Sequence, residues 1–401
     1  MKDNRRLPSF DPALGPGPFA SLFWPKLLHA AGLALRPQRV LLGMFGVLLI
    51  ALADRLPVLW NKGGVQAFQT WLAGAVESLG RVRSGLAGAD PGLVGGGLGS
   101  IFITSPRELF AHAPLGTLVT LLISLPAWAL LSLAVCRSCA TEFALGERLT
   151  WPESVAFARS RWLSGIGVLL SPWIVLYSTI LLLAILGWVL LRWPYVQVLG
   201  GAVYVIALPL GVLGVVVLLG LLLGGWMLVP AVACEGSDWI DGVQRVYAYA
   251  VARPARLAAY LVVLAIAGVL CIGAAWVVTH LIAGFTFRAS MLWLPDTTAA
   301  NLSGRTLWMH HAADVSDAAD AIADTDAGGS AARGLVGFWT RLPLWLALGY
   351  AASYICCAGT VLYLTMRRVC DGQDIGELWK PGMIPGTGAP VSPEGEEGDD
   401  E

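Results

Sequence analysis

The chain alternates between long apolar stretches and short polar connections. Six stretches contain the roughly 20 mainly apolar residues that a helix needs to cross a hydrocarbon layer of ~30 Å. They lie at about residues 38–60, 114–136, 164–191, 198–233, 257–284 and 342–366. The third and fourth stretches are joined by the tight connection "LRWPYVQ" and should form a helical hairpin. This pattern predicts an all-α polytopic membrane protein with six transmembrane helices.

A polar motif recurs after every even-numbered span. "CEGSDWIDGV" (234–243) follows the fourth span, "CDGQDIGELW" (370–379) follows the sixth, and "GERLTWPESV" (146–155) is a looser copy after the second, in which Glu147 aligns with Glu235. Its glycines, Gly236 and Gly372, suit the left-handed residue that ends a helix. The residues Thr150, Asp238 and Asp374 are good N-caps, each followed three positions later by an acid, as in a capping box.

A second element leads into the odd-numbered spans. "RPQRVLLG" (36–43) and "RPARLAAY" (253–260) precede the first and fifth spans, and "ARSRWLSG" (158–165) precedes the third. Before each entry lies a segment whose apolar residues have helical spacing and which begins with Trp24, Trp151 or Trp239. Such a segment suits an amphipathic helix lying in the membrane interface. The predicted architecture is therefore three parallel hairpin repeats, each preceded by a cytoplasmic interfacial amphipathic helix.

The composition agrees with a membrane protein. Only 13% of the residues are charged and the mean hydropathy is +0.69, whereas soluble domains have about 25% charged residues. The net charge of −1 gives no reason to expect nucleic acid as a partner. The excess of Arg over Lys, together with abundant Ala and Gly, is typical of a GC-rich bacterial genome.

Lys and Arg placement predicts the orientation. These residues gather in the N-terminal arm, in the connections after the second and fourth spans, and after the sixth span. Because cytoplasmic loops are enriched in Lys and Arg, we expect both termini to lie in the cytoplasm of a bacterial inner membrane.

The same reasoning divides the chain into an N-terminal arm with its interfacial helix (1–37), a membrane domain (38–366) and a C-terminal turn with an acidic tail (367–401). Two extracytoplasmic loops are expected at about 57–112 and 288–340. The first contains "GADPGLVGGGLGS", expected to be flexible. The tail "SPEGEEGDDE" is expected to be disordered.

The recurring acidic turns allow a second interpretation. If the three units pack around a common axis, their acids and thiols would meet on the cytoplasmic face and offer ligands for a metal ion. The candidates for this functional cluster are Glu147, Cys234, Glu235, Cys370 and Asp371. Helix capping explains the glycine, the N-cap and the following acid together, so the sequence predicts no metal site and no cofactor.

Two other groups of residues are candidates for chemistry. His280 lies well inside the fifth span and, with Tyr204 and Tyr354, could line a polar intramembrane pocket or make hydrogen bonds between helices. His310 and His311 lie in the second extracytoplasmic loop, where they could bind one ion together only from irregular backbone. A solvated acidic loop is the alternative there.

The stretch "PAVACEGSDWIDGV" (230–243) and the Arg-Pro entry after it resemble a group of bacterial six-span proteins. The group includes the membrane domain attached to some glycerophosphoryl diester phosphodiesterases and related uncharacterised families. The resemblance implies an integral membrane protein of unassigned function. It implies no phosphodiesterase activity, because residues 1–401 are expected to hold spans, loops and a tail without a soluble catalytic domain.

The sequence shows no P-loop, dinucleotide fingerprint, zinc-protease helix or serine-hydrolase elbow. It therefore predicts a non-enzymatic accessory, scaffold or membrane-organising protein. Its expected partners are the lipid bilayer and either other membrane proteins or further copies of the chain. The alternative is a permease or lipid-handling channel with a polar path through spans 2–4, where Pro126, Pro172 and Pro209 should kink the helices.

Overall fold

A computed structural model describes residues 24–60, 67–192, 197–290, 292–293, 327–380 and 383 of the 401-residue chain. These described ranges form helices and turns and contain no strand. Six of their helical segments are long and apolar enough to cross a membrane: Pro37–Pro57, Pro114–Leu145, Trp162–Leu191, Gly200–Glu235, Pro254–Ser290 and Gly334–Asp371. The predicted spans are confirmed, and the chain is an all-α multi-pass membrane protein.

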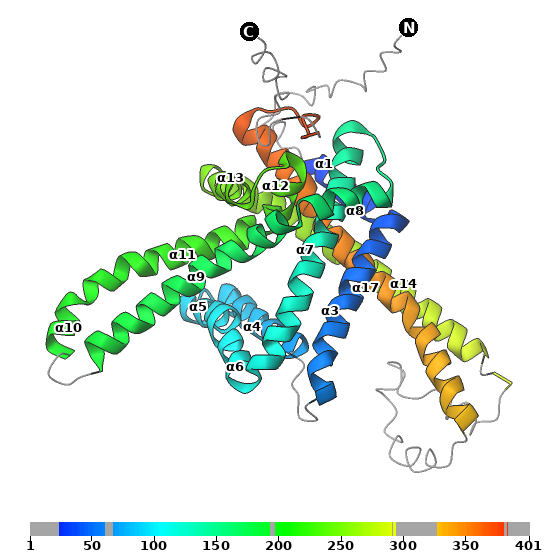
Figure 1. Ribbon diagram of the computed structural model, residues 1–401, viewed down its shortest axis with the longest axis horizontal. Coiled ribbons are helices and arrows are strands. Elements are labelled where there is room, and N and C mark those ends of the chain that lie inside the picture. The colour runs from blue at the N-terminus through cyan, green and yellow to red at the C-terminus, as the bar shows by residue number, and fades with distance from the viewer. Residues whose placement is uncertain are drawn as a thin grey trace, which may run out of the picture.

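The spans are formed mainly by long helices, and the fourth span is broken and ends in the short helix α12 (Figure 1). These are α3 (Pro37–Trp60), α7 (Pro114–Leu145), α9 (Trp162–Leu191), α11 (Ala207–Gly224), α12 (Leu228–Glu235), α14 (Pro254–Ser290) and α17 (Ala327–Asp371). Shorter helices stand before three of the spans, where the sequence predicted helices. They are α1 (Trp24–Leu27) and α2 (His29–Ala34) before α3, α8 (Trp151–Ser160) before α9, and α13 (Trp239–Ala252) before α14.

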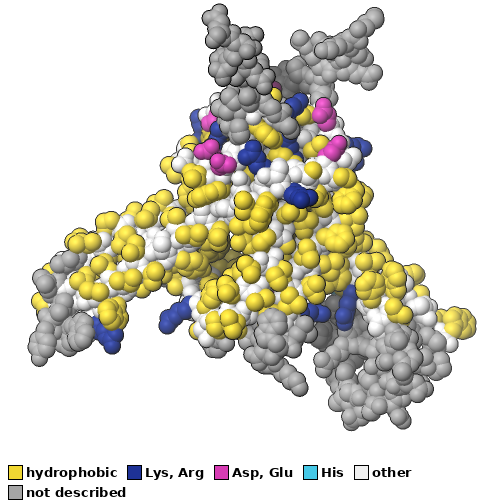
Figure 2. Space-filling model, viewed as in Figure 1, with side chains coloured by type: hydrophobic (Ala, Val, Ile, Leu, Met, Phe, Trp, Pro, Cys, Tyr) yellow, Lys and Arg dark blue, Asp and Glu magenta, His cyan; other side chains and the backbone are white. Residues whose placement is uncertain are grey.

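Three hairpins diverge from one junction, which we call the head (Figure 1). The head comprises α1, α2, α8, α12 and α13, the adjoining ends of α7, α9, α14 and α17, and residues 372–380. The hairpins are α3 with α7, α9 with α11, and α14 with α17. Figure 2 shows charged side chains gathered over the head, whereas hydrophobic side chains cover the hairpins.

Left-handed glycines end three helices at the head. Gly236 and Gly372 have φ values of +60° and +72°, as the sequence predicted, and Gly146 has φ +71°. Gly146 is thus the counterpart of Gly236, which corrects the alignment that paired Glu147 with Glu235. We call the helix end and the turn after each even-numbered span a joint. The first joint has two extra residues between Gly146 and Trp151. Glu147 therefore follows its glycine, whereas Glu235 precedes Gly236.

The third joint also differs from its prediction. Asp374 was expected to cap a following helix, but residues 372–380 form turns and irregular chain. The Asp374 carboxylate instead accepts a hydrogen bond from the Ile375 N–H at 2.9 Å and pairs with Arg368 at 2.6 Å. The predicted capping box is present at α8, where Glu153 accepts the Thr150 N–H at 2.8 Å.

The glycine-rich segment expected to be flexible is helical. It forms α5 (Pro91–Gly99), followed by a π-helical turn (Ser100–Thr104) and α6 (Ser105–His112). Asp90 caps α5 by accepting hydrogen bonds from the N–H groups of Gly92 and Leu93, at 2.8 and 3.2 Å. A Cβ at Gly97 would lie 2.6 Å from Val82 of α4 (Ala67–Ala87), so this glycine allows α5 to pack closely on α4.

The fourth span contains two 3₁₀ segments, each placed just before a proline. Tyr204–Ile206 ends three residues before Pro209, and Gly225–Met227 ends three residues before Pro230. A proline leaves the carbonyl four residues upstream without its helical N–H partner, and a local 3₁₀ turn is one adjustment that accommodates this loss. The second segment divides the span into α11 and α12. The prolines Pro126 and Pro172 lie inside the continuous helices α7 and α9.

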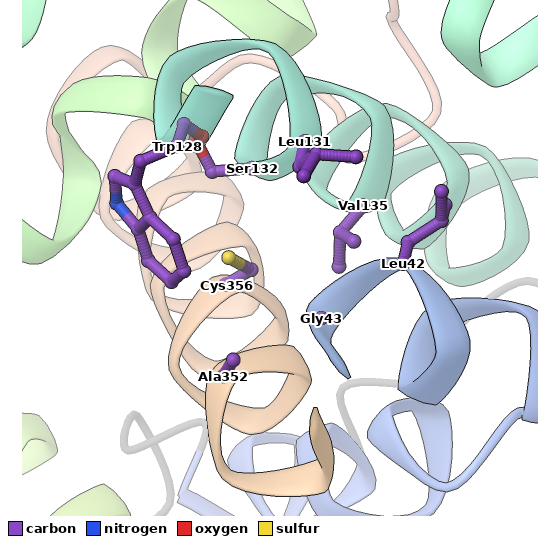
Figure 3. A pocket seen from close by; sticks show the side chains of 8 residues that line it. All are labelled: Leu42, Gly43, Trp128, Leu131, Ser132, Val135, Ala352 and Cys356. Carbon is purple, nitrogen blue, oxygen red and sulfur yellow. The ribbon is translucent and has the colours of Figure 1, made fainter. Parts of the chain in front are cut away.

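Small residues bring α3 and α17 together beside the head. A Cβ at Gly43 of α3 would overlap the carbonyl oxygen of Gly349 in α17, so the two backbones touch. Such small-residue contacts are a common basis of helix packing in membranes. Figure 3 shows the gap left where α3, α7 and α17 meet, lined by residues that include Leu42, Trp128 and Cys356. Its volume is about 10 Å³, so this part of the molecule is closely packed.

Candidate functional site

The structure brings together two of the three predicted acidic joints. Glu235, at the end of α12, is buried, and Asp371 ends α17. Tyr363 donates a hydrogen bond to Glu235 Oε1 at 3.1 Å, and Tyr249 donates one to Asp371 Oδ2. The two tyrosine rings lie 5.9 Å apart and thereby join the acids into one network.

Glu147 is not part of this network. It lies on the surface of the turn between α7 and α8, after Gly146 rather than before it. Cys234 is buried beside Glu235, and Cys370 is half-buried beside Asp371. Among the described residues, no group of three or more His, Cys, Asp or Glu side chains is arranged to hold a metal ion. The five candidate residues therefore do not form one convergent cluster.

Arginines surround the Glu235 carboxylate. Arg367 Nη1 lies 2.8 Å from Oε1, and Arg245 Nη1 lies 3.6 Å from Oε2. The Arg367 side chain is only 1% exposed, so this is a buried ion pair. Burial by itself lowers the pKa of Arg245, but the Glu235 carboxylate, together with Tyr363, Tyr249 and Asp371, raises that pKa overall. Burial, and then the hydrogen bond to Asp371, raise the pKa of Tyr249.

The same arginine holds the chain that follows α17. Arg367 Nη2 donates to the carbonyl oxygens of Asp374 and Glu377, at 3.0 and 2.7 Å. The Trp379 N–H donates to the Cys234 carbonyl at 3.0 Å. The C-terminal segment (372–380) is therefore attached both to α17 and to the end of α12.

Arg137 of α7 completes this attachment. It donates to the Ala233 carbonyl at 3.0 Å and to the Trp379 carbonyl at 2.7 Å. Its guanidinium also lies 4.7 Å from the centre of the Phe157 ring, and that of Arg161 lies 5.2 Å from a Trp379 ring. Arg137 thus connects α7, α8, α12 and the C-terminal segment through donors that only a guanidinium provides in this geometry.

A second arginine cluster surrounds Glu142 at the end of α7. Arg36 donates to Oε1 at 2.6 Å, Arg39 donates to Oε2 at 2.6 Å, and Arg148 lies 3.5 Å from Oε1. Arg39 is 2% exposed and also donates to Ser138 Oγ and to the carbonyls of Ser138 and Leu33. This cluster joins α2, α3 and α7 as the Glu235 cluster joins α12, α13 and α17.

A pocket of about 330 Å³ opens beside the Glu142 cluster. It lies between α1, α2 and the end of α7, and its lining residues are Lys26, His29, Leu33, Glu142, Phe143, Gly146 and Arg148. Burial, and then the nearby positive charge of Arg368, lower the pKa of Lys26, while Asp374 opposes them. The pocket is therefore lined by two cationic side chains, one carboxylate and the apolar Leu33 and Phe143.

The predicted intramembrane pocket is not assembled. Tyr204 belongs to the 3₁₀ turn beside α10 (Gln197–Val203), at the tip of the α9–α11 hairpin, whereas His280 belongs to α14, which runs in the opposite direction (Figure 1). His280 Nδ1 lies 2.9 Å from the Trp276 carbonyl of its own helix. Tyr354 is buried and donates to the Leu264 carbonyl at 2.7 Å. The three side chains thus belong to separate parts of the described structure. The His310–His311 segment, the N-terminal arm up to residue 23 and the acidic tail lie outside the described residues.

Several residues at the head were not among the predicted site residues. Arg137, Glu142, Arg245, Tyr363, Arg367 and Trp379 are the principal ones. The available signal was their position, because a charged side chain inside or at the end of a long apolar helix needs a partner. From the sequence, the arginines indicated only the cytoplasmic side. Comparisons with family models, with curated proteins and with solved structures give no match to this chain.

Proposed function

We propose that this chain is a non-enzymatic accessory or scaffold protein of a bacterial inner membrane, which organises the surrounding bilayer or neighbouring membrane proteins. One observation supports this proposal most directly. Three apolar hairpins diverge from a single head that is fixed by buried ion pairs (Figures 1 and 2). A rigid junction with widely exposed apolar arms offers surface to lipid and to other helices.

The α9–α11 hairpin is one example of the exposed apolar surface. On α11, Val212, Val215 and Leu219 are 63%, 54% and 50% exposed. Their spacing of three and four residues places them on one face of the helix. Within a bilayer this face contacts either lipid or another helix, and association there depends on close side-chain packing.

The proposal includes the orientation and the repeat. We place the head in the cytoplasm, because the arginines that surround Glu142 and Glu235 belong to the segments with most Lys and Arg. The three helix ends at Gly146, Gly236 and Gly372, and the short helices before α3, α9 and α14, support three related hairpin units. The resemblance to the membrane domain of glycerophosphoryl diester phosphodiesterases stays a sequence-based prediction.

The experiment is complementation of a strain that lacks the gene. Membrane complexes are separated on native gels, and uptake of labelled solutes is measured in parallel. We expect the pattern of complexes to change in the deletion strain and to be restored by the wild-type chain. The triple variant Val212→Ala, Val215→Ala, Leu219→Ala should be stably inserted but restore it poorly. Loss of uptake of one defined solute, with the complexes intact, would contradict the proposal.

One observation favours the alternative of a permease or lipid-handling channel. The two 3₁₀ segments of the fourth span interrupt its helix within the proposed path through spans 2–4. Purified protein in liposomes separates the two functions. A permease gives solute or lipid movement that depends on Pro209 and Pro230, whereas a scaffold gives none above that of protein-free liposomes.

A further inference from the structure

The helices between the first two spans return into the layer that the spans occupy. We call residues 67–112, which form α4, α5, the π-helical turn and α6, the insertion. It is attached to the ends of α3 and α7 that lie away from the head. The Gln69 N–H donates to the Asp54 carboxylate at 3.2 Å, and the Thr117 hydroxyl donates to the Leu109 carbonyl at 3.3 Å. Figure 1 shows α4, α5 and α6 between the α3–α7 and α9–α11 hairpins.

The insertion reaches the middle of the third span. The Tyr177 hydroxyl of α9 donates to the Phe102 carbonyl at 3.1 Å, and the centres of the Phe102 and Trp173 rings lie 5.5 Å apart. Tyr177 and Trp173 lie near the middle of the span Trp162–Leu191. Because the two ends of a span lie at the two membrane surfaces, its middle lies inside the hydrocarbon layer at any tilt. Phe102 therefore lies at that depth, and residues 91–106 around it include no charged side chain.

One side of α4 packs against this uncharged segment. A Cβ at Gly85 would lie 2.8 Å from the backbone nitrogen of Val94, and one at Gly74 would lie 3.3 Å from the Ser105 hydroxyl. The helix thus runs beside the segment that contains Phe102, on both sides of it along the sequence. α4 is therefore held next to the membrane layer by the same contact that fixes Phe102.

A second side of α4 is apolar and exposed. Four large apolar residues follow one another at helical spacings of four, three and seven positions: Leu72, Val76, Leu79 and Leu86. This spacing places them on one face of the helix, which we call the α4 stripe. They are between 46% and 69% exposed. Figure 2 shows hydrophobic side chains over the part of the molecule where Figure 1 places α4 and α6.

The third side of α4 is polar and is turned away from the α4 stripe. Glu77 and Arg81 lie one helical turn apart and form an exposed ion pair at 2.9 Å, and Ser84 lies on the same side. Arg83 is the charged residue on the side of the α4 stripe. Its apolar stem can lie along the stripe while its guanidinium reaches the headgroups. A helix with one apolar and one charged side is typical of the membrane interface.

We propose that α4 is an interfacial membrane helix, with the α4 stripe against the acyl chains of the leaflet away from the head and with Glu77 and Arg81 towards water. Lipid is the partner because Phe102 binds the insertion to the middle of a membrane span. The segment 57–112, expected from the sequence to be an extracytoplasmic loop, is in this respect part of the membrane domain. This inference does not depend on the scaffold function, because a permease would hold the same helix in the membrane.

The test is thiol modification by a charged, water-soluble maleimide, with single copies of the full chain in phosphatidylcholine nanodiscs. Leu79→Cys places a thiol on the α4 stripe, and Ser84→Cys is the matched control on the polar side; both positions are exposed. We expect Leu79→Cys to react about tenfold or more slowly than Ser84→Cys, because the hydrocarbon layer excludes a charged reagent. The two should react at similar rates in dodecyl sulfate. Val76→Cys is a second stripe position and should behave as Leu79→Cys does.

Modification is measured peptide by peptide with mass spectrometry, which separates each new thiol from the seven native ones. Equal rates for Leu79→Cys and Ser84→Cys in nanodiscs would overturn the proposal, because the α4 stripe would then face water. Protection of Leu79→Cys in native membranes that is lost in single-copy nanodiscs would also overturn it and would assign the stripe to a partner protein or a second copy.

A photoactivatable phosphatidylcholine, with the reactive group in its acyl chain, provides a second measurement on the wild-type chain. We expect it to label the peptide that contains Val76 and Leu79. Labelling of the span peptides without this one would contradict contact between lipid and the α4 stripe.

Discussion

The two halves of the fourth span differ more than their sequences suggest. All eight residues of α12 are buried, whereas only four of the eighteen residues of α11 are. Both halves are strongly apolar, so hydropathy does not explain the difference. In a bilayer, lipid tails solvate apolar side chains as well as a protein interior does, and helices associate through close packing and polar contacts.

Polar contacts account for the burial of α12. Arg137 binds the Ala233 carbonyl, the Trp379 N–H binds the Cys234 carbonyl, and Arg367 binds Glu235. At the break before α12, Gly359 of α17 lies against the Trp226 carbonyl, which Pro230 leaves without a helical donor. The comparison indicates that charged and small residues, rather than overall hydropathy, distinguish the buried end of this span from its exposed part.

We expect Glu235→Gln, at the buried end of α12, to lower the free energy of unfolding most. It leaves Arg367, with a 1% exposed side chain, as a buried charge without its carboxylate. Removing one partner of a buried ion pair costs about 3–5 kcal/mol. We expect a loss of that order in the free energy of unfolding, measured by titrating the detergent-solubilised protein with dodecyl sulfate.

The control for this variant is Glu147→Gln, which changes an exposed acid at the first joint and should leave stability within about 0.5 kcal/mol of wild type. If both variants were equally mild, the ion pair would not be what fixes the head.

Two leucines, one buried and one exposed, test how much apolar packing contributes to stability. Leu133 of α7 is fully buried and contacts Gly165 of α9, whereas Leu181, further along α9, is 60% exposed. Leu133→Ala should cost about 2–5 kcal/mol, and Leu181→Ala should change stability by about 0.5 kcal/mol or less. Both are measured by the same unfolding titration. A large cost for Leu181→Ala would mean that another helix, in a partner or a second copy, covers the α9–α11 hairpin.

Glycine-to-alanine substitutions should affect stability differently at the head and in the α9–α11 hairpin. Gly236 has φ +60°, and a Cβ there would overlap the Trp379 ring. A left-handed alanine costs about 1–2 kcal/mol, so Gly236→Ala should lower the unfolding temperature and loosen the C-terminal segment. At Gly187 of α9, an added Cβ would have no neighbouring atom within 4 Å. Gly187→Ala should therefore be neutral, or stabilising by up to about 1 kcal/mol.

Protease access to the C-terminal segment tests whether Gly236→Ala only strains the left-handed backbone or also displaces Trp379. Faster cleavage near residue 380 in Gly236→Ala than in wild type, at a temperature where both are folded, would show that Trp379 has left the joint. Equal cleavage would contradict the contact between Gly236 and Trp379.

The sequence was sufficient to predict the elements that depend on local pattern. The six spans, the helices before α3, α9 and α14, and the left-handed glycines at 236 and 372 follow from apolar periodicity and from helix-ending chemistry. The first joint was misaligned, because its two extra residues moved Glu147 past its glycine. A short degenerate motif cannot reveal such an insertion.

The candidate site was much less predictable. Glu142 and Arg39 lie 103 positions apart, and Arg137 and Trp379 lie 242 apart. Their contacts depend on how the hairpins are placed, which no local pattern determines. Asp374 was predicted as a helix cap because its local sequence suits one, but no helix follows it in the described part of the chain, and Arg367 and Arg368 bind the turn instead.

The smallest predicted effect concerns the capping box of α8, at the edge of the head. The Thr150 N–H, donated to the exposed Glu153 carboxylate, lowers the pKa of that acid in the folded protein. A lowered folded pKa means that the stabilisation is present above the ordinary pKa of about 4.3 and is lost as the pH falls through the lowered value. Glu153→Gln should therefore reduce the unfolding temperature slightly at neutral pH, and the difference from wild type should vanish in acid.

Asp241→Asn is the comparison for this variant, because Asp241 occupies the same position in α13. Within the residues that the structure describes, it makes no such bond to the backbone of Asp238, the residue before α13. Its variant should show no difference that shrinks in acid. A pH-dependent difference as large as that of Glu153→Gln would mean that both short helices are held by their caps. The head would then depend on local helix ends as well as on the buried arginines, and the contrast between α12 and α11 would need both causes.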